Sequence, residues 1–309
     1  MLGYVVRRLL FSVVVIVVAA SLSFLLVRLS PSDPAVVLLG STATPEELFA
    51  ERERLGLNDP LLVQYVNFMS GLVRMDLGPS LMRGGSAMDL VLSRLPNSLL
   101  LGGVAMLFII FVSVPLGLLA GRFRGRYADQ FVTTGSLVGQ ALPEFWVGLM
   151  LMLVFSRILG WLPSGGLGGP AYLLMPAITL ALPATSVMVR LVRSEMINAL
   201  REEYVDTARS KGLTERVVLV SHALPNTLIP VVTVGGLKLG YLLGGTAIVE
   251  TVFSWPGIGS LLVSSIGLRD FPVIQASIVV ITAIVVLVNL CVDLLYGYLN
   301  PRIQVGSEE

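Results

Sequence analysis

The sequence predicts an all-α polytopic membrane protein with six transmembrane helices. Of its 309 residues, 55% are hydrophobic and only 13% are charged, and apolar runs of spanning length recur along the chain. A mean hydropathy of +0.85 excludes an ordinary soluble domain. The formal net charge of +1 says little about partners, because in a membrane protein the placement of charge matters more than its sum.

The first apolar run covers Leu9 to Leu29 and follows Arg7 and Arg8. No small-residue cleavage site precedes the next loop, so we expect this span to be retained. Five further runs are each close to the roughly 20 residues that cross a hydrocarbon core of about 30 Å. They are Leu99 to Gly121, Phe131 to Leu159, Tyr172 to Leu191, Thr227 to Val249 and Ala276 to Leu299.

Prolines lie inside three of these runs, at Pro115, Pro143 and Pro183. A proline removes one backbone donor and clashes with the preceding turn, so each should kink or locally open its helix. A helix bundle tolerates such a kink where neighbouring groups or water satisfy the freed carbonyls.

Basic residues set the orientation, because they gather in the short loops of one side only. By the positive-inside rule that side is cytoplasmic, so both termini are expected there. The opposite short loops carry only Arg157 and Arg269. The cytoplasmic set is Arg7, Arg8, Arg122, Arg124, Arg126, Arg193, Arg201, Arg209, Lys211 and Arg216.

The chain divides into three regions on this reading: residues 1–29 with the first span, an external loop at 30–98, and a transmembrane core at 99–309. Within the loop, the Pro45-Glu46-Glu47 start predicts a short helix that ends at Gly56. The loop carries eight acids against five arginines. Contact with a soluble partner and simple solvation explain that count equally well.

The stretch from Glu203 to Pro230 is a charged insertion between two apolar runs. Its acids come early and its bases late, as a helix macrodipole favours, and Gly212 supplies a stop. We expect Thr214 to cap a second helix that Pro225 and Pro230 keep short. The result is a helix, glycine turn, helix hairpin on the cytoplasmic side. An ordinary interfacial pair of amphipathic helices is the simpler alternative.

This hairpin resembles the cytoplasmic loop of permease subunits of ATP-binding-cassette (ABC) importers. That loop reads E-A-A, three residues, G, nine residues, I-x-L-P, and here Asp206-Thr207-Ala208, Gly212 and His222-Ala223-Leu224-Pro225 stand at those spacings. The chain departs from the pattern at Asp206, Thr207 and His222. The run TARSKGL followed by VLVSHAL is closer still to the dipeptide and oligopeptide branch of these permeases.

The resemblance implies a type I importer permease fold in a bacterial or archaeal inner membrane. It also implies a second homologous permease, two cytoplasmic ATPase subunits and an external solute-binding protein. The loop at 194–226 would couple to one ATPase. The residues expected to do so are Glu203, Asp206, Thr207, Ala208, Arg209, Lys211, Gly212, Leu224 and Pro225.

The segment at 250–275 is too polar and too broken by prolines and glycines to span, so we expect a re-entrant or surface-lying helix. Its W-P-G-I-G and R-D-F-P-V-I-Q runs also resemble the family, which implies an outer plug over the pathway. An interfacial helix anchored by Trp255 with no gating role is the alternative. The expected gate residues are Trp255, Pro256, Gly257, Arg269 and Asp270.

No constellation supports catalysis, since neither Lys211 nor Lys238 lies in a Gly-rich nucleotide loop. The chain is therefore expected to bind no cofactor, with ATP and Mg²⁺ held by the partner subunits. A single cysteine and a single histidine argue against a Cys/His metal cluster. Cytoplasmic charges of mixed sign argue against nucleic acid.

A stand-alone channel or an intramembrane enzyme is the hypothesis from another class. A channel does not need the hairpin, and an enzyme should show paired carboxylates, a nucleophile dyad or metal ligands on adjacent helices. Peptides are the expected solute. Glutathione, nickel chelates, opines and oligosaccharides remain open, because related permeases carry them on the same scaffold.

Two ionisable residues fall deep inside predicted spans. Glu144 and Lys238 lie at similar depth if the third and fifth spans are straight helices. A charge there costs at least about 2.5 kcal/mol unless it is paired or faces water. We therefore expect either a buried ion pair that fixes helix packing or two groups that line the translocation path.

Overall fold

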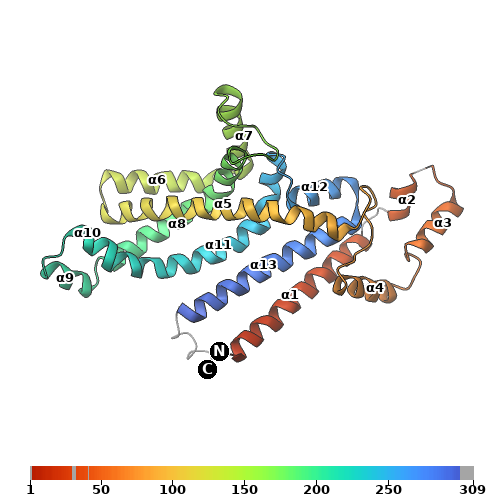
Figure 1. The fold of residues 1–309 in the computed structure, drawn as a ribbon, viewed down its shortest axis with the longest axis horizontal. Helices are drawn as coiled ribbons and strands as arrows, with labels where there is room; N and C mark the ends of the chain where they lie inside the picture. Colours follow the sequence, from red (N-terminus) through yellow and green to blue (C-terminus); the bar gives the residue numbers. More distant parts are fainter. Residues whose placement is uncertain (1, 30–32, 41, 300–309) are drawn as a thin grey trace.

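The computed structural model describes residues 2–29, 33–40 and 42–299. Residue 1 and residues 300–309, which belong to the first and last predicted regions, lie outside the described residues. Long helices run side by side and form the body of the molecule (Figure 1). They are α1 (Leu2–Leu29), α5 (Ala87–Arg122), α8 (Ala171–Ala199), α11 (Leu224–Val252) and α13 (Phe271–Leu299).

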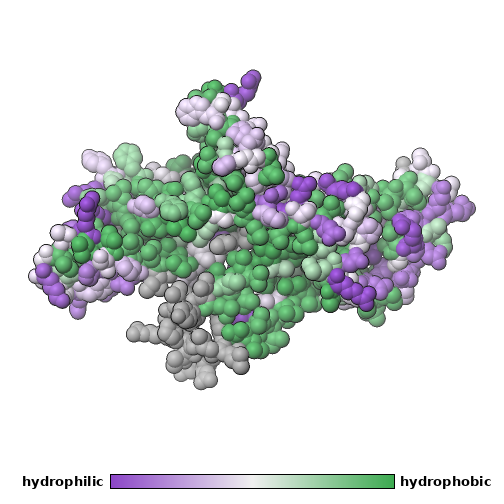
Figure 2. Space-filling model, in the orientation of Figure 1, coloured by the Kyte–Doolittle hydropathy of each residue, from purple (hydrophilic) through white to green (hydrophobic). Residues whose placement is uncertain are grey.

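The bundle has two distinct ends (Figure 1). The short helices α9 (Glu203–Ser210) and α10 (Glu215–Val217) lie at one of them, here called the hairpin end. The helices α2 (Pro34–Leu39), α3 (Pro45–Arg54) and α4 (Leu61–Val73) lie at the other, the cap end. Hydrophobic side chains cover the middle of the molecule, and hydrophilic ones gather towards both ends (Figure 2). This distribution is that of a protein that crosses a bilayer.

Four described helices are long and apolar enough to span, and two bent pairs raise the number to six if each pair is one span. The six predicted spans therefore have counterparts, although their bounds differ. The second begins at Ala87 rather than at Leu99, and Pro115 lies inside it without ending the helix. Likewise α8 continues through Pro183.

The third predicted span is not one continuous helix. It consists of α6 (Tyr127–Ala141) and α7 (Glu144–Leu151), which meet at 103° and are followed by a π-helical segment, Met152–Ile158. The break falls at Leu142 and Pro143, where the backbone is extended. Proline disfavours the α conformation in the residue before it, so the chain leaves the helix here. Consequently α7 projects from the bundle (Figure 1).

The main core lies where α5, α8 and α11 meet. Small residues permit their close approach: a Cβ added at Gly117 of α5 would lie 2.5 Å from Val192 Cβ of α8. A second cluster joins the start of α5 to α13 and to the short helix α12 (Ile258–Leu268). The buried residues at its centre include Val91, Ile258 and Val273. These clusters fix the hairpin end and the cap end relative to each other.

The described residues between α1 and α5, here called the cap, have more helical structure than the sequence predicted. The expected helix at Pro45 is present, with a capping box between Thr44 and Glu47 and a positive φ of 65° at Gly56. Backbone and side-chain hydrogen bonds from Thr44 lower the pKa of the Glu47 carboxyl. The short α2 and the apolar α4 were not predicted.

Candidate functional site

The first helix of the hairpin forms as its charge pattern predicts. Glu203 and Asp206 occupy the first turn of α9, and Arg209 the last. The helix stops because Gly212 adopts a left-handed φ of 78°, and its N–H donates to the Arg209 carbonyl at 2.9 Å. Glycine reaches this conformation without the steric cost that a Cβ imposes. The hairpin turn is therefore confirmed.

One predicted docking residue points into the hairpin instead of outward. Ala208 is only 4% exposed and packs with Val205 and Val218, both fully buried. This small core holds α9 against the chain that follows. The small Ala208 side chain therefore packs within the hairpin, and its role in coupling stays a prediction. The i, i+3 spacing of Val205 and Ala208 was the available signal.

The remaining predicted residues of α9 and its turn are exposed. Arg209, however, is engaged within the chain: it donates to Glu215 at 2.9 Å and to Asp206 at 3.4 Å. The Glu215 hydrogen bond is the main cause that raises the pKa of the Arg209 guanidinium. The other exposed residues form the outer surface of α9 and its turn, and they include Tyr204, which was not predicted from the sequence. The exposed set is Glu203, Tyr204, Asp206, Thr207, Lys211 and Gly212.

The second half of the hairpin differs from the prediction. Thr214 stands at the N-cap of α10, but its side chain makes no capping hydrogen bond. Nor does Pro225 end the helix, because a π-helical segment, Val218–Ala223, leads directly into α11, which has Pro225 in its first turn. Proline is tolerated there, since the first turn needs no intrahelical donor. The chain bends by 48° between Glu215–Leu228 and Pro230–Leu242. Leu224 is half-buried and Pro225 is exposed.

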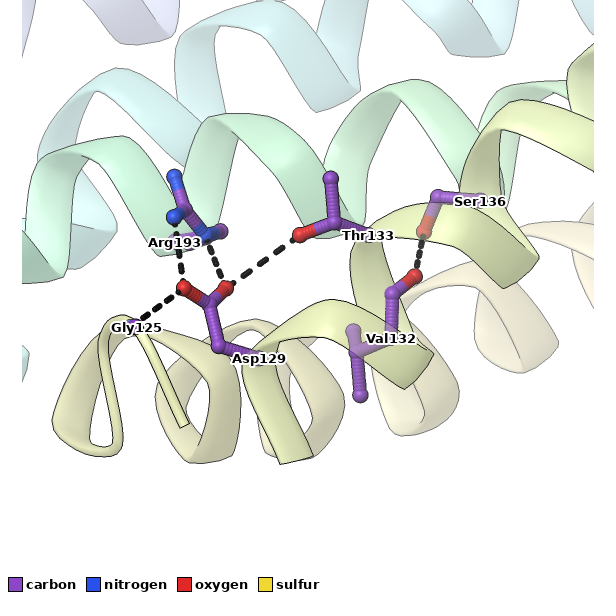
Figure 3. Close-up of polar contacts among 6 residues, drawn as sticks. All are labelled: Gly125, Asp129, Val132, Thr133, Ser136 and Arg193. Carbon is purple, nitrogen blue, oxygen red and sulfur yellow. Dashed lines mark hydrogen bonds and ion pairs between the residues drawn. The ribbon is translucent and has the colours of Figure 1, made fainter. Parts of the chain in front are cut away.

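An ion pair at the hairpin end was not predicted from the sequence. Asp129 of α6 is 4% exposed, and Arg193 of α8 donates to both of its oxygens, at 2.5 and 2.8 Å (Figure 3). The same carboxylate accepts from the Gly125 N–H at 2.9 Å and from the Thr133 hydroxyl at 3.2 Å. It thereby ties the turn before α6 to α8, the helix that leads into the hairpin.

The other expected site lies at the cap end, before α12. Trp255 is 1% exposed, and its indole N–H donates to the Asn97 carbonyl at 3.0 Å. The Asn97 amide in turn donates to the Pro256 carbonyl at 2.8 Å. Trp255 is therefore a core residue and does not anchor the helix at the membrane interface, whereas the gating role of the segment stays a prediction.

A buried carboxylate that was not predicted organises this segment. Glu250, at the end of α11, has no exposed surface; it accepts from the Ser98 hydroxyl at 2.7 Å and from the Ser260 N–H at 2.9 Å. The Ser98 oxygen also accepts from the Ile258 N–H at 2.8 Å. Gly257 lies against this carboxylate, where a Cβ would come within 2.3 Å of it. Three elements, α5, α11 and α12, are held together here.

The end of α12 is anchored to the cap. Asp270 is fully buried and accepts from the Ser80 hydroxyl at 2.5 Å and from the Leu81 N–H at 3.0 Å. Arg269 beside it is exposed and has a left-handed φ of 58°, which ends α12. The predicted gate residues are thus brought together around one short helix, but its two ends are fixed by different contacts.

The two charges predicted inside the membrane do not meet. No ion pair joins Glu144 and Lys238 in the described chain, and the Lys238 ammonium instead lies 5.6 Å from the centre of the Tyr241 ring. The prediction of equal depth assumed a straight third span. The 103° break before Glu144 removes that basis. Both side chains are half-buried.

Metal binding is not indicated by the described residues, which contain no group of three or more His, Cys, Asp or Glu that could hold an ion.

Comparison with known proteins decides the family. Residues 113–305 match the family described as "Binding-protein-dependent transport system inner membrane component", and residues 1–102 match its N-terminal companion. The chain belongs to this family. It is a permease subunit of an ABC importer, a multi-pass protein of the inner membrane, in a class of systems that combine permease, ATPase and binding protein.

Two curated relatives match almost end to end. The chain is 39% identical to the glutathione transport system permease protein GsiC of Salmonella typhimurium over 304 residues, 98% of this chain and 99% of the relative. It is 38% identical over the same length to GsiC of Escherichia coli K12. Among solved structures, the inward-facing MetNI methionine ABC transporter has a TM-score of 0.58 at 18% identity, covering 69% of this chain and 97% of that one. This likeness supports the permease fold alone.

Proposed function

We propose that this permease subunit forms half of the inner-membrane path for short peptides or peptide-like molecules such as glutathione. The observation that carries the proposal is the 39% identity, over nearly the whole of both chains, to a glutathione permease. Glutathione is itself a tripeptide, so the peptide assignment and this relative agree in chemical class. Nickel chelates, opines and oligosaccharides are the competing solutes.

The energy for transport comes from partner subunits in this proposal. ATP and Mg²⁺ bind to two ATPase subunits, since this chain has no Gly-rich nucleotide loop. The hairpin end faces the cytoplasm, as the loop arginines and lysines favour. The exposed face of α9, with Tyr204, Thr207 and Lys211, enters a groove of one ATPase. The ordered Gly212 turn and the buried Val205 and Ala208 make the hairpin rigid enough to carry motion from the ATPase to the membrane helices.

The cap end controls access from outside. The segment from Trp255 to Asp270 forms the outer gate, held by Glu250 at one end and by Asp270 at the other. Glu144 and Lys238 line the path as separate charges, where a carboxylate and an ammonium meet the two ends of a zwitterionic peptide. Their lack of a mutual ion pair supports this role over a packing role.

The substrate assignment is tested in proteoliposomes that contain the full complex: this chain, the second permease, both ATPases and the binding protein. Uptake of labelled glutathione and of a labelled α-linked tripeptide is measured, each with the other as competitor. We expect ATP-dependent uptake of at least one, with cross-competition. Uptake of a nickel chelate, opine or oligosaccharide with neither peptide accepted would overturn the peptide assignment and leave the permease assignment intact.

A further inference from the structure

A cavity of about 330 Å³ lies at the cap end, between the last turn of α1, the cap and the start of α13. Much of its wall is apolar and aromatic, with Phe24 of α1, Phe68 of α4 and Phe271 of α13. Phe24 packs on Phe68 with ring centres 5.5 Å apart, so the wall is formed by side chains that support one another. The volume falls within the usual range for a small-molecule site.

Two polar groups on the cavity wall are left with unused hydrogen-bonding capacity. The Nε of Arg28 and the Oε1 of Gln64 are both buried without a partner. Gln64 is oriented by its own amide group, whose nitrogen donates to the Leu57 and Asp59 carbonyls at 3.0 and 2.7 Å. Its oxygen is thereby left as an acceptor. Leaving a buried polar atom without a partner is costly, so both sites favour a ligand that completes them.

The charges of the wall favour an anion. The other cavity arginine, Arg54, is neutralised by Glu51 through two hydrogen bonds, the Nε one at 2.9 Å. The Arg28 guanidinium makes no ion pair in the described chain and lies 5.4 Å from the centre of the Phe24 ring. An aromatic ring does not neutralise a cation, so the cavity keeps one net positive charge next to an acceptor.

The position of the cavity identifies the source of that anion. Arg28 stands in the last turn of α1, directly after a span whose Leu22, Leu25 and Leu26 are exposed. Helix α1 lies along the side of the bundle, with α4 across its end (Figure 1). Such exposed leucines face hydrocarbon, and Arg28, which follows them at the end of the same helix, lies at the depth of lipid headgroups.

We propose that this cavity binds one phospholipid whose headgroup carries a hydrogen-bond donor. The phosphodiester accepts from Arg28, the ethanolamine ammonium or the glycerol hydroxyl donates to Gln64 Oε1, and the upper part of an acyl chain packs on Phe24 and Phe68. A choline headgroup has no N–H or O–H, so it leaves Gln64 unsatisfied and binds less well.

The test uses the complete importer in nanodiscs made with equal parts of phosphatidylethanolamine, phosphatidylglycerol and phosphatidylcholine. Native mass spectrometry after release measures retained lipid, and a phospholipid with a photoactivatable acyl chain maps the contact. We expect one retained ethanolamine or glycerol lipid, about tenfold more occupied than choline lipid, crosslinked to peptides that contain Phe24 or Phe68.

Arg28→Gln should reduce that occupancy about tenfold, whereas Arg74→Gln, an exposed arginine of the same cap, should leave it unchanged. Complex assembly by size-exclusion chromatography verifies that both variants fold. Equal retention of choline lipid, unchanged occupancy in Arg28→Gln, or lipid crosslinks found only outside the peptides that contain Phe24 and Phe68 would each overturn the proposal.

Discussion

The guanidinium of Arg193 on α8 donates hydrogen bonds to both oxygens of the Asp129 carboxylate on α6, at 2.5 and 2.8 Å. The two residues are 64 positions apart, and the pair lies where the chain turns from α5 into α6. Because α8 leads into the hairpin, any force on the hairpin reaches α6 through this contact as well as through α5. The pair is therefore a structural link between the hairpin and the broken third span.

Asp129→Asn should destabilise the subunit by about 2–3 kcal/mol, below the range for a fully buried pair because the Arg193 side chain is 28% exposed. The change leaves a cation without its counter-charge and converts a charge-assisted contact into a neutral one. Reversible unfolding in mixed micelles measures the loss. Arg124→Gln, an exposed arginine of the same turn, serves as control and should change stability by less than about 0.5 kcal/mol. Equal effects of the two changes would contradict the link.

A second expectation concerns the packing of Gly257 against Glu250. In Gly257→Ala, the new Cβ would lie within 2.3 Å of the buried carboxylate, which cannot move without losing Ser98 or Ser260. Overpacking of this kind costs about 1–3 kcal/mol. Gly267→Ala on the same helix meets nothing within 4 Å, so it should be neutral or slightly stabilising. Thermal melts of the two variants provide the measurement, and a Gly257 variant as stable as the Gly267 variant would contradict the packing argument.

Local sequence signals predicted the α9 helix and its end at Gly212, because helix charge pattern and a left-handed turn are decided within a few residues. The contacts of Asp129 and Glu250 could not be predicted in this way. Their partners, Arg193 and Ser98, lie 64 and 152 positions away, and only the packing of the helices brings them together. The interruption expected at Pro143 is present, but the depth estimate for Glu144 treated the third span as a straight helix. Composition identifies an apolar stretch of spanning length, but it does not show how sharply a proline bends it.

Glu144 and Lys238 provide a third expectation. Since they form no ion pair, the effects of Glu144→Gln and Lys238→Gln on stability should add, with a coupling energy below about 0.5 kcal/mol in a double-mutant cycle. Transport should change differently: removal of either charge should reduce the preference for free-ended over end-blocked peptides. A double variant more stable than either single variant would restore the ion-pair hypothesis. Unchanged substrate preference in all three variants would exclude a role in the path.

The last prediction concerns Gly212, whose φ of 78° forms the turn of the hairpin. A Cβ added there meets nothing within 4 Å in this chain, so the effect of a substitution comes from the backbone conformation and from contact with a partner. Valine resists the left-handed region at a cost of about 1–2 kcal/mol or more, whereas asparagine tolerates it.

Gly212→Val should therefore leave the membrane helices folded but reduce uptake per ATP hydrolysed by about tenfold. The backbone strain of about 1–2 kcal/mol at position 212 brackets roughly 1.4 kcal/mol, which corresponds to a factor of ten. Gly212→Asn, the matched control, should keep most of the coupling. Uptake and ATP hydrolysis are measured together in proteoliposomes of the full complex, with a melting curve for each variant. Normal uptake and normal binding-protein stimulation of ATP hydrolysis in Gly212→Val would show that the hairpin turn does not couple the movement of the ATPase subunits to the membrane helices. A loss of coupling in the valine variant but not in the asparagine variant would show that the left-handed turn itself is needed for closure of the ATPase subunits to open the path.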